Sequence, residues 1–181
     1  MIYLMLADGF EEVEAMAPVD VLRRAGADLK TVGVTGRMVI GAHGVPMQAD
    51  CTPEEVDLAA ADMVILPGGM PGTKNLYASA FVRDAVQYCI DHDKYVAAIC
   101  AAPSVVLGGM GLLQGKEATC YPGMEDGMAG ANAQPKPYCI AGKIITGRAA
   151  GAAFDFALAL CAVLKGEAVA EQVRRDIVYV G

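Results

Sequence analysis

Ala97-Ala98-Ile99-Cys100-Ala101-Ala102-Pro103-Ser104 is the stretch that decides the fold of this chain. The apolar run from Tyr95 to Ile99 predicts a buried strand, and this strand stops at a cysteine. Small residues follow at once, and Pro103 suits the first turn of a helix, where its missing N–H costs nothing. The stretch therefore predicts a strand–turn–helix elbow with Cys100 at the bend.

The elbow favours a reactive thiol at Cys100. A helix that begins just after the bend turns its free N–H groups and the positive end of its dipole toward the sulfur. Such surroundings lower the pKa of a thiol and make it a nucleophile. The alternative is a cysteine packed at the end of a strand, since free cysteine is among the most buried residue types.

Composition narrows the class of protein. The chain has 181 residues, of which 55% are hydrophobic, and this length predicts a single domain over residues 1–181. Its 14 basic and 21 acidic residues give a net charge of −7, which argues against nucleic acid or an anionic membrane as a partner. The N-terminus enters an apolar strand directly, without the pattern of a signal peptide.

The cysteine pattern indicates the compartment. Six cysteines are present without a C-x-x-C pair, so neither a zinc site nor a disulfide scaffold is expected. We therefore expect a cytoplasmic protein whose thiols stay reduced, with no metal.

Strand-like and helical patterns alternate along the chain, which predicts a doubly wound and mostly parallel sheet. The strand candidates are Ile2–Ala7, Leu29–Val34, Met38–Ile40, Val45–Ala49, Met63–Leu66, Tyr95–Ile99, Ala118–Cys120, Tyr138–Ile140 and Lys143–Thr146. The helix candidates are Glu12–Ala25, Phe81–Asp91, Gly151–Leu164 and Glu167–Arg174. Such a sheet places its binding site beyond the carboxyl ends of its strands.

Three turns fall at that edge: Asp8-Gly9-Phe10, Pro67-Gly68-Gly69 and Cys100-Ala101-Ala102. Backbone N–H groups in the glycine turn can face an anion or a developing oxyanion. The alternative is an ordinary loop, because Pro and Gly are common in loops that bind nothing. The turn lacks the pattern of a phosphate-binding loop.

Acidic residues crowd the start of the first helix. Helix-dipole stabilisation accounts for Glu11 and Glu12, and the spacing from Asp8 to Glu11 is similar to a capping box. Glu14 lies one turn further in, where the dipole effect has faded, and its carboxyl is a candidate to face the cysteine.

Both histidines, His43 and His92, precede Cys100 in the sequence. Elbow-type cysteine proteases and glutaminases use a histidine base that follows the cysteine, so neither activity is expected. His92 is interpreted as a surface residue, and His43, in a glycine-rich loop, is a candidate to line the pocket.

Several blocks in this order are similar to the ThiJ/PfpI superfamily, on the branch of the human parkinsonism-associated protein deglycase. The blocks are Gly9–Glu14, Pro18–Gly26, Val64–Gly69, Ala97–Pro103 and Ile145–Arg148 with Phe154–Leu158. The resemblance implies an α/β fold, a flavodoxin-like (class I glutamine amidotransferase-like) α/β/α sandwich. It also implies a homodimer that forms partly through the first helix, around Pro18–Arg24.

The resemblance assigns roles to residues. It makes Cys100 the nucleophile and Glu14 its proton donor and acceptor, with the N–H groups of Gly69 and Ala101 as the oxyanion-binding pair. It also implies that Arg148 holds anionic groups of the substrate.

This chain departs from the family pattern at two positions. Tyr121 replaces a pocket histidine that is frequent on this branch, and Ala102 stands where relatives often have glycine. Ala101 stands where the peptidase branch has histidine, which argues against peptidase activity.

The resemblance and the Cys100–Glu14 pair together indicate a cofactor-free glyoxalase or deglycase that acts on small α-oxoaldehydes such as methylglyoxal and glyoxal. The alternative is a redox-sensing or stress-protective, chaperone-like protein that acts through oxidation of Cys100. A link to thiazole or thiamine biosynthesis is less favoured, because no residue pattern supports it.

Overall fold

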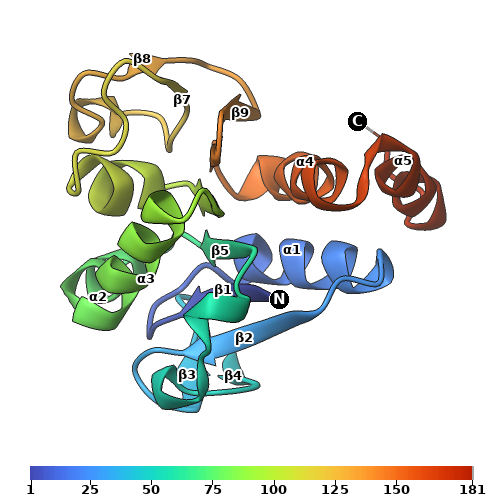
Figure 1. Cartoon of the computed structure of the whole chain (residues 1–181), viewed down its shortest axis with the longest axis horizontal. Helices are drawn as coiled ribbons and strands as arrows, with labels where there is room; N and C mark the ends of the chain where they lie inside the picture. Colours follow the sequence, from blue (N-terminus) through green and yellow to red (C-terminus); the bar gives the residue numbers. More distant parts are fainter. Residues whose placement is uncertain (181) are drawn as a thin grey trace.

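The computed structural model describes residues 1–180 and has a six-stranded sheet at its centre, in the order β2-β1-β5-β6-β10-β9 (Figure 1). The strands are β1 (Ile2–Leu6), β2 (Leu29–Gly33), β5 (Met63–Leu66), β6 (Tyr95–Ile99), β9 (Tyr138–Ala141) and β10 (Ile144–Gly147). All neighbouring pairs are parallel except β9 with β10 at the edge. The predicted sandwich with a mostly parallel sheet is confirmed.

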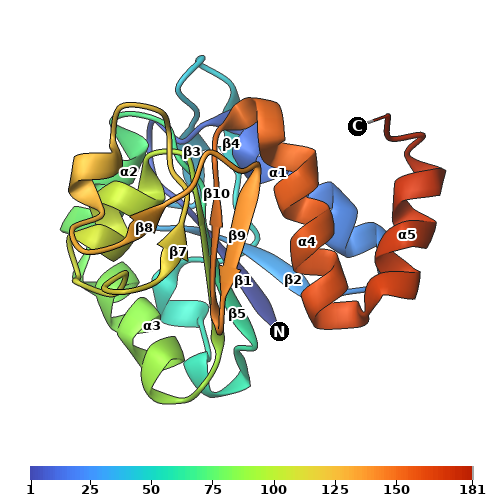
Figure 2. The same cartoon turned by 90° about the horizontal axis from the view of Figure 1, so that it is seen from above.

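Helices cover both faces of this sheet (Figures 1 and 2). One face carries α1 (Glu12–Arg24), α4 (Ala153–Lys165) and α5 (Glu167–Asp176), and the other carries α2 (Gly72–Ala78) and α3 (Ala80–Asp91). Successive side chains of β1 alternate between the two cores: Leu4 packs with the α1 and α4 side, and Met5 with the α3 side. Within residues 1–180 no helix is long and apolar enough to cross a bilayer.

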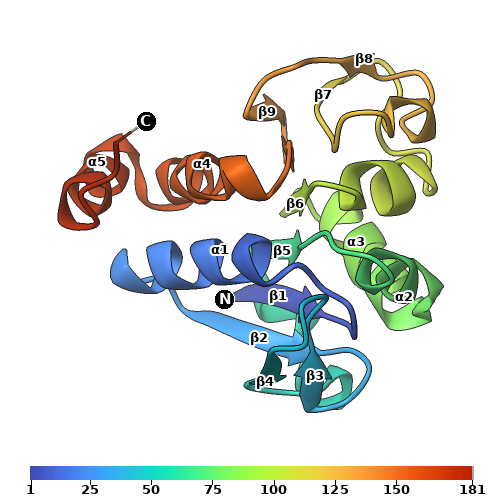
Figure 3. The ribbon, with the colours of Figure 1, turned by 180° about the vertical axis from the view of Figure 1, so that it is seen from behind.

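Two small sheets and four short turns of 3₁₀ helix complete the fold. The hairpin of β3 (Met38–Ile40) and β4 (Pro46–Gln48) lies beside β2 (Figure 3), and β7 (Glu117–Ala118) pairs with β8 (Asn132–Ala133). The 3₁₀ turns span Pro53–Glu55, Leu58–Ala60, Glu125–Gly127 and Ala150–Ala152.

Two local predictions were wrong, and one helix was not predicted. The strand expected over Ala118–Cys120 is the two-residue β7, which lies outside the central sheet. Helix α2 was not predicted, because its start follows directly on a glycine- and proline-rich turn. The segment after the elbow is a six-residue π-helix over Pro103–Gly108, too short to carry the helix dipole that was expected to act on Cys100.

Helix α1 begins at Glu12 and continues through Pro18 to Arg24. It ends in a Schellman motif: Gly26 has φ +66°, and Ala27 donates its N–H to the Leu22 carbonyl at 2.9 Å. Gly26 accepts this left-handed conformation without the steric cost that a side chain would add. The register of α1 is thereby fixed, and with it the position of Glu14.

Candidate active site

The three predicted turns meet at the carboxyl edge of the sheet. Glu11, at the start of α1, donates its N–H to the Gly68 carbonyl at 3.0 Å, and Gly72 donates to the Gly9 carbonyl at 3.2 Å. At Gly69 a Cβ atom would overlap the backbone of Glu11 and Phe10. The chain segments approach too closely for side chains here, so glycine is required.

Gly68 separates Glu14 from Cys100. Its N–H donates to Oε2 of Glu14 at 2.9 Å. An alanine Cβ at position 68 would lie 2.5 Å from that oxygen and 2.6 Å from the Cβ of Cys100. The absent side chain lets the carboxyl of Glu14 and the thiol of Cys100 face each other and interact.

The backbone of Cys100 is held in a conformation that L residues rarely adopt. Its φ is +65°, in the left-handed region, and it directly follows β6. Its N–H donates to the Gly147 carbonyl at 3.0 Å, and its carbonyl accepts from the Tyr121 N–H at 2.8 Å. Both backbone groups are thus fixed by neighbouring segments, which offsets the strain and sets the direction of the sulfur.

Cys100 is half-buried, whereas the other five cysteines, including Cys51, are buried. Cys51, which the sequence places in a loop, is covered and directs its sulfur to the Thr31 carbonyl. Among the cysteines, access from solvent therefore favours Cys100.

The charges of the pair are strongly coupled. Burial raises the pKa of Glu14 to about 7, against the lowering effect of its hydrogen bonds with Cys100 and Gly68. Burial, and then the neighbouring Glu14 carboxylate, raise the pKa of the Cys100 thiol to about 12. The expectation of a thiol pKa lowered by a helix N-terminus is therefore wrong, because burial and the carboxylate outweigh the local N–H groups.

The pair therefore takes up its first negative charge as pH rises through about 7, and a thiolate forms readily only while Glu14 carries the proton. The backbone N–H groups of Ala101 and Gly69 both interact with the sulfur and favour its ionised form. Oε1 of Glu14 has no hydrogen-bond partner among residues 1–180 and is buried. One oxygen of the carboxyl is thus buried without a hydrogen-bond partner among these residues.

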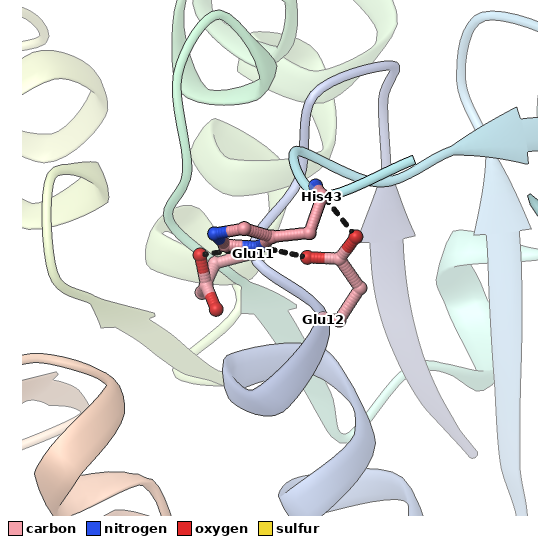
Figure 4. Close-up of side chains that lie close together, drawn as sticks. All are labelled: Glu11, Glu12 and His43. Atoms are coloured by element: carbon pink, nitrogen blue, oxygen red, sulfur yellow. Dashed lines mark hydrogen bonds and ion pairs between the residues drawn. The ribbon is translucent and has the colours of Figure 1, made fainter. Parts of the chain in front are cut away.

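The acidic cluster is arranged differently from a capping box. Asp8 accepts from the backbone N–H of Ile40 at 2.8 Å, and the Glu11 side chain caps no helix N–H. Glu12 and Glu11 instead face His43, whose Nδ1 lies 2.8 Å and 3.6 Å from their respective Oε2 atoms (Figure 4). His43 is thus held at the start of α1, with these two glutamates as its ion-pair partners.

Arg148 and Tyr121 are the remaining predicted site residues. Arg148 follows β10 and lines a cavity of about 150 Å³ together with Cys120 and Glu125. Tyr121 has a side chain that is 50% exposed and is tied to Cys100 through its backbone N–H. A larger cavity, of about 500 Å³, lies at the opposite end of the sheet beside Met1 and Tyr95.

Comparisons with known proteins agree with this geometry. The model of the DJ-1/PfpI family matches residues 1–163. The chain is 34% identical over 180 residues to the Parkinson disease protein 7 homolog of Danio rerio, covering 97% of this chain and 95% of that protein. It is 36% identical over 179 residues to Protein DJ-1 homolog B of Arabidopsis thaliana, covering 98% of this chain but only 41% of the plant protein.

A more distant relative is the Deglycase PYRAB04690 of Pyrococcus abyssi, 30% identical over 131 residues, which cover 72% of this chain and 77% of that protein. Among solved structures, that of oxidized Toxoplasma gondii DJ-1 superposes with a TM-score of 0.95 at 33% identity, covering 99% of this chain and 98% of the other. The family match, the relatives and the shared fold together show that the chain belongs to the DJ-1/PfpI family.

Proposed function

We propose that this chain is a cysteine-dependent, cofactor-free glyoxalase or deglycase that converts α-oxoaldehydes such as methylglyoxal and glyoxal into hydroxy acids. The observation that carries the proposal is the pairing of a half-buried thiol with a buried carboxyl whose pKa is raised to about 7. A deglycase of the same family is consistent with carbonyl chemistry at this site.

In this reaction the Cys100 thiolate attacks the aldehyde carbon of methylglyoxal and forms a C–S bond. The N–H groups of Gly69 and Ala101 stabilise the resulting oxyanion, which takes the proton of Glu14 to give a hemithioacetal. The Glu14 carboxylate then removes the hydrogen from that carbon and returns a proton to the neighbouring carbon, through an enediol. Water hydrolyses the thioester, so methylglyoxal and water become lactate and the thiol is regenerated.

The same addition step acts on the carbonyl of an early glycation adduct. Arg148 is proposed to hold anionic groups of the substrate, with Tyr121 and His43 at the rim of the pocket. Tyr121 is 50% exposed, and its backbone N–H donates to the Cys100 carbonyl, which supports a place for it near the elbow.

The test is lactate formation from methylglyoxal in the absence of glutathione. We expect turnover by the wild type and loss of nearly all of it in Cys100→Ser and in Glu14→Gln, because the two residues act as a unit. Cys139→Ser, which changes a buried thiol distant in sequence from the elbow, serves as the matched control. Full activity in Cys100→Ser would exclude the mechanism, and a wild type without lactate would exclude this substrate.

Redox sensing through Cys100 is the second candidate, and the contrast between one half-buried and five buried thiols favours it. A structural neighbour in this family is described as oxidized. Graded peroxide followed by peptide mass spectrometry should show oxygen on Cys100 before any other cysteine, mainly as sulfinate. If Cys51 gains oxygen first while Cys100 stays reduced, this second candidate is wrong.

A further inference from the structure

Three potential metal ligands meet outside the Cys100–Glu14 pair: the carboxylates of Glu11 and Glu12 and the imidazole of His43 (Figure 4). Each offers one donor atom, and these atoms all lie within 4.8 Å of one another. We infer that Glu11, Glu12 and His43 form a binding site for one divalent transition-metal ion, with Zn²⁺ as the ion of the matching chemistry. The inference is independent of the proposed catalytic reaction.

The distances suit a single ion. Nδ1 of His43 lies 2.8 Å from Oε2 of Glu12 and 3.6 Å from Oε2 of Glu11. Donors bonded to zinc at about 2.0–2.1 Å stand about 3.3 Å apart in a tetrahedral site, so these two separations are each within about 0.5 Å of that value. The two carboxylate oxygens lie within 4.8 Å of each other and close around an ion by side-chain rotation. One imidazole nitrogen and two carboxylate oxygens are ligands that zinc accepts, and a fourth position remains for water.

The site is organised by the backbone before any ion binds. The hairpin loop that carries His43 is fixed to the start of α1, because Ala42 donates its N–H to the Phe10 carbonyl at 2.8 Å. The second oxygen of Glu12, Oε1, accepts from the backbone N–H of His43 at 2.8 Å. This outer hydrogen bond orients the carboxylate so that Oε2 points at the imidazole, as supporting contacts do in metal sites.

Glu12 also depends on Gly41 for its position. A Cβ at Gly41 would overlap the Glu12 carboxyl, so the side chain reaches the hairpin only because residue 41 is glycine. The His43 side chain is 69% exposed, which gives an ion an open path from solvent.

The charge of the cluster favours a divalent cation over a proton. The two carboxylates together carry two negative charges, and a proton on His43 neutralises only one of them. A divalent cation bound to the neutral imidazole and both carboxylates neutralises both charges. The positive end of the α1 dipole opposes a cation here, which makes both carboxylates necessary. We therefore expect that neutralising either carboxylate weakens binding as clearly as removing the imidazole does.

The experiment is calorimetric titration of tag-free protein with zinc chloride at about pH 8, where histidine is available as a neutral ligand. It is carried out in the Cys100→Ser background, which removes the half-buried thiol as a competing ligand. His43→Ala, Glu12→Gln and Glu11→Gln are compared with His92→Ala, the matched control, because His92 is the second of the two histidines and is also exposed.

We expect one equivalent of zinc, an affinity at least about tenfold weaker in each of the three cluster variants, and unchanged binding in His92→Ala. Titration with copper(II), followed by electron paramagnetic resonance, should show nitrogen coupling that His43→Ala abolishes. Thermal melts of the apo variants establish that each is folded. No binding up to millimolar zinc, or stoichiometric binding that His43→Ala leaves intact, would overturn the inference.

Discussion

Burial of Glu14 makes the stability of the folded chain depend on pH. Its pKa is raised from 4.5 to about 7, so the folded chain holds a proton that the unfolded chain has lost. The contribution to stability is fully present below about pH 4.5 and is lost as pH rises through 7, since a buried carboxyl must then ionise. The shift corresponds to about 3 kcal/mol of unfolding free energy.

We therefore predict that the wild type loses stability between about pH 5 and pH 8 and that Glu14→Gln, which cannot ionise at this position, shows little of that loss. Chemical denaturation of both proteins across this range measures the effect. Glu171→Gln, on the exposed surface of α5, is the control and should run parallel to the wild type. A wild type and a Glu14→Gln variant that lose equal free energy would show that the Glu14 pKa is not raised.

A second prediction concerns Gly68, which touches both members of the pair. An alanine there would place its Cβ 2.5 Å from Oε2 of Glu14 and 3.1 Å from Sγ of Cys100. Because neither atom can retreat without breaking the contact between the two groups, Gly68→Ala should lower turnover of methylglyoxal at least about 100-fold. Gly151→Ala, where a Cβ meets nothing within 4 Å, should retain wild-type activity. Equal activity in the two variants would show that the contact is not needed.

At the scale of elements, the elbow between β6 and the π-helix is a place where glycine should stabilise the fold more than alanine does, the reverse of the order inside a helix. Cys100 has φ +65°, a conformation that costs an L residue about 1 kcal/mol or more and glycine nothing. We predict that Cys100→Gly is more stable than Cys100→Ala by about 1 kcal/mol. Cys89, in the interior of α3, should show the opposite order, with Cys89→Ala the more stable. Thermal denaturation of the four variants checks this, and the same order at both positions would contradict it.

These elements also show what sequence patterns can and cannot predict. The run Tyr95–Ile99 is apolar, is preceded by charged residues and is followed by small ones, so its place as a buried central strand follows from pattern alone. The π-helix over Pro103–Gly108 does not follow, because its pattern is the same as that of an α-helix until tertiary contacts are known. The expected lowering of the thiol pKa fails for a different reason, because burial of Cys100 and the neighbouring Glu14 carboxylate raise that pKa and neither effect is visible in the local pattern.

The cluster of Glu11, Glu12 and His43 could not be predicted from the sequence, for a different reason. His43 is 31 residues from Glu12, and no motif links the two positions. Only the placement of the β3–β4 hairpin against the start of α1 brings them together (Figure 4). Glu14, by contrast, lies one turn into a predicted helix at the edge of a predicted sheet, so its approach to Cys100 could be anticipated.

At the scale of the whole molecule, an apolar surface lies beside the active site. Val13 is 47% exposed and Phe154 is 40% exposed, and they line a shallow groove with Met16, Ala17 and Asp20. The exposed side chains of Pro18–Arg24, the segment expected to contribute to the dimer, are charged, and Asp20, which pairs with Arg24, lies at this groove. If the chain forms a homodimer, burying the exposed apolar side chains of the groove between α1 and α4 would stabilise it most.

We predict a homodimer at micromolar concentration that buries this groove against a second copy of the chain. Val13→Asp places a charge within the apolar contact and should give a monomer, because an unpaired charge is costly to bury. Met38→Asp, at a similarly exposed position on strand β3 and outside this groove, should leave the dimer intact. Light scattering after size-exclusion chromatography distinguishes the cases. A monomeric wild type excludes the dimer, and a dimer that survives Val13→Asp places its interface on another face.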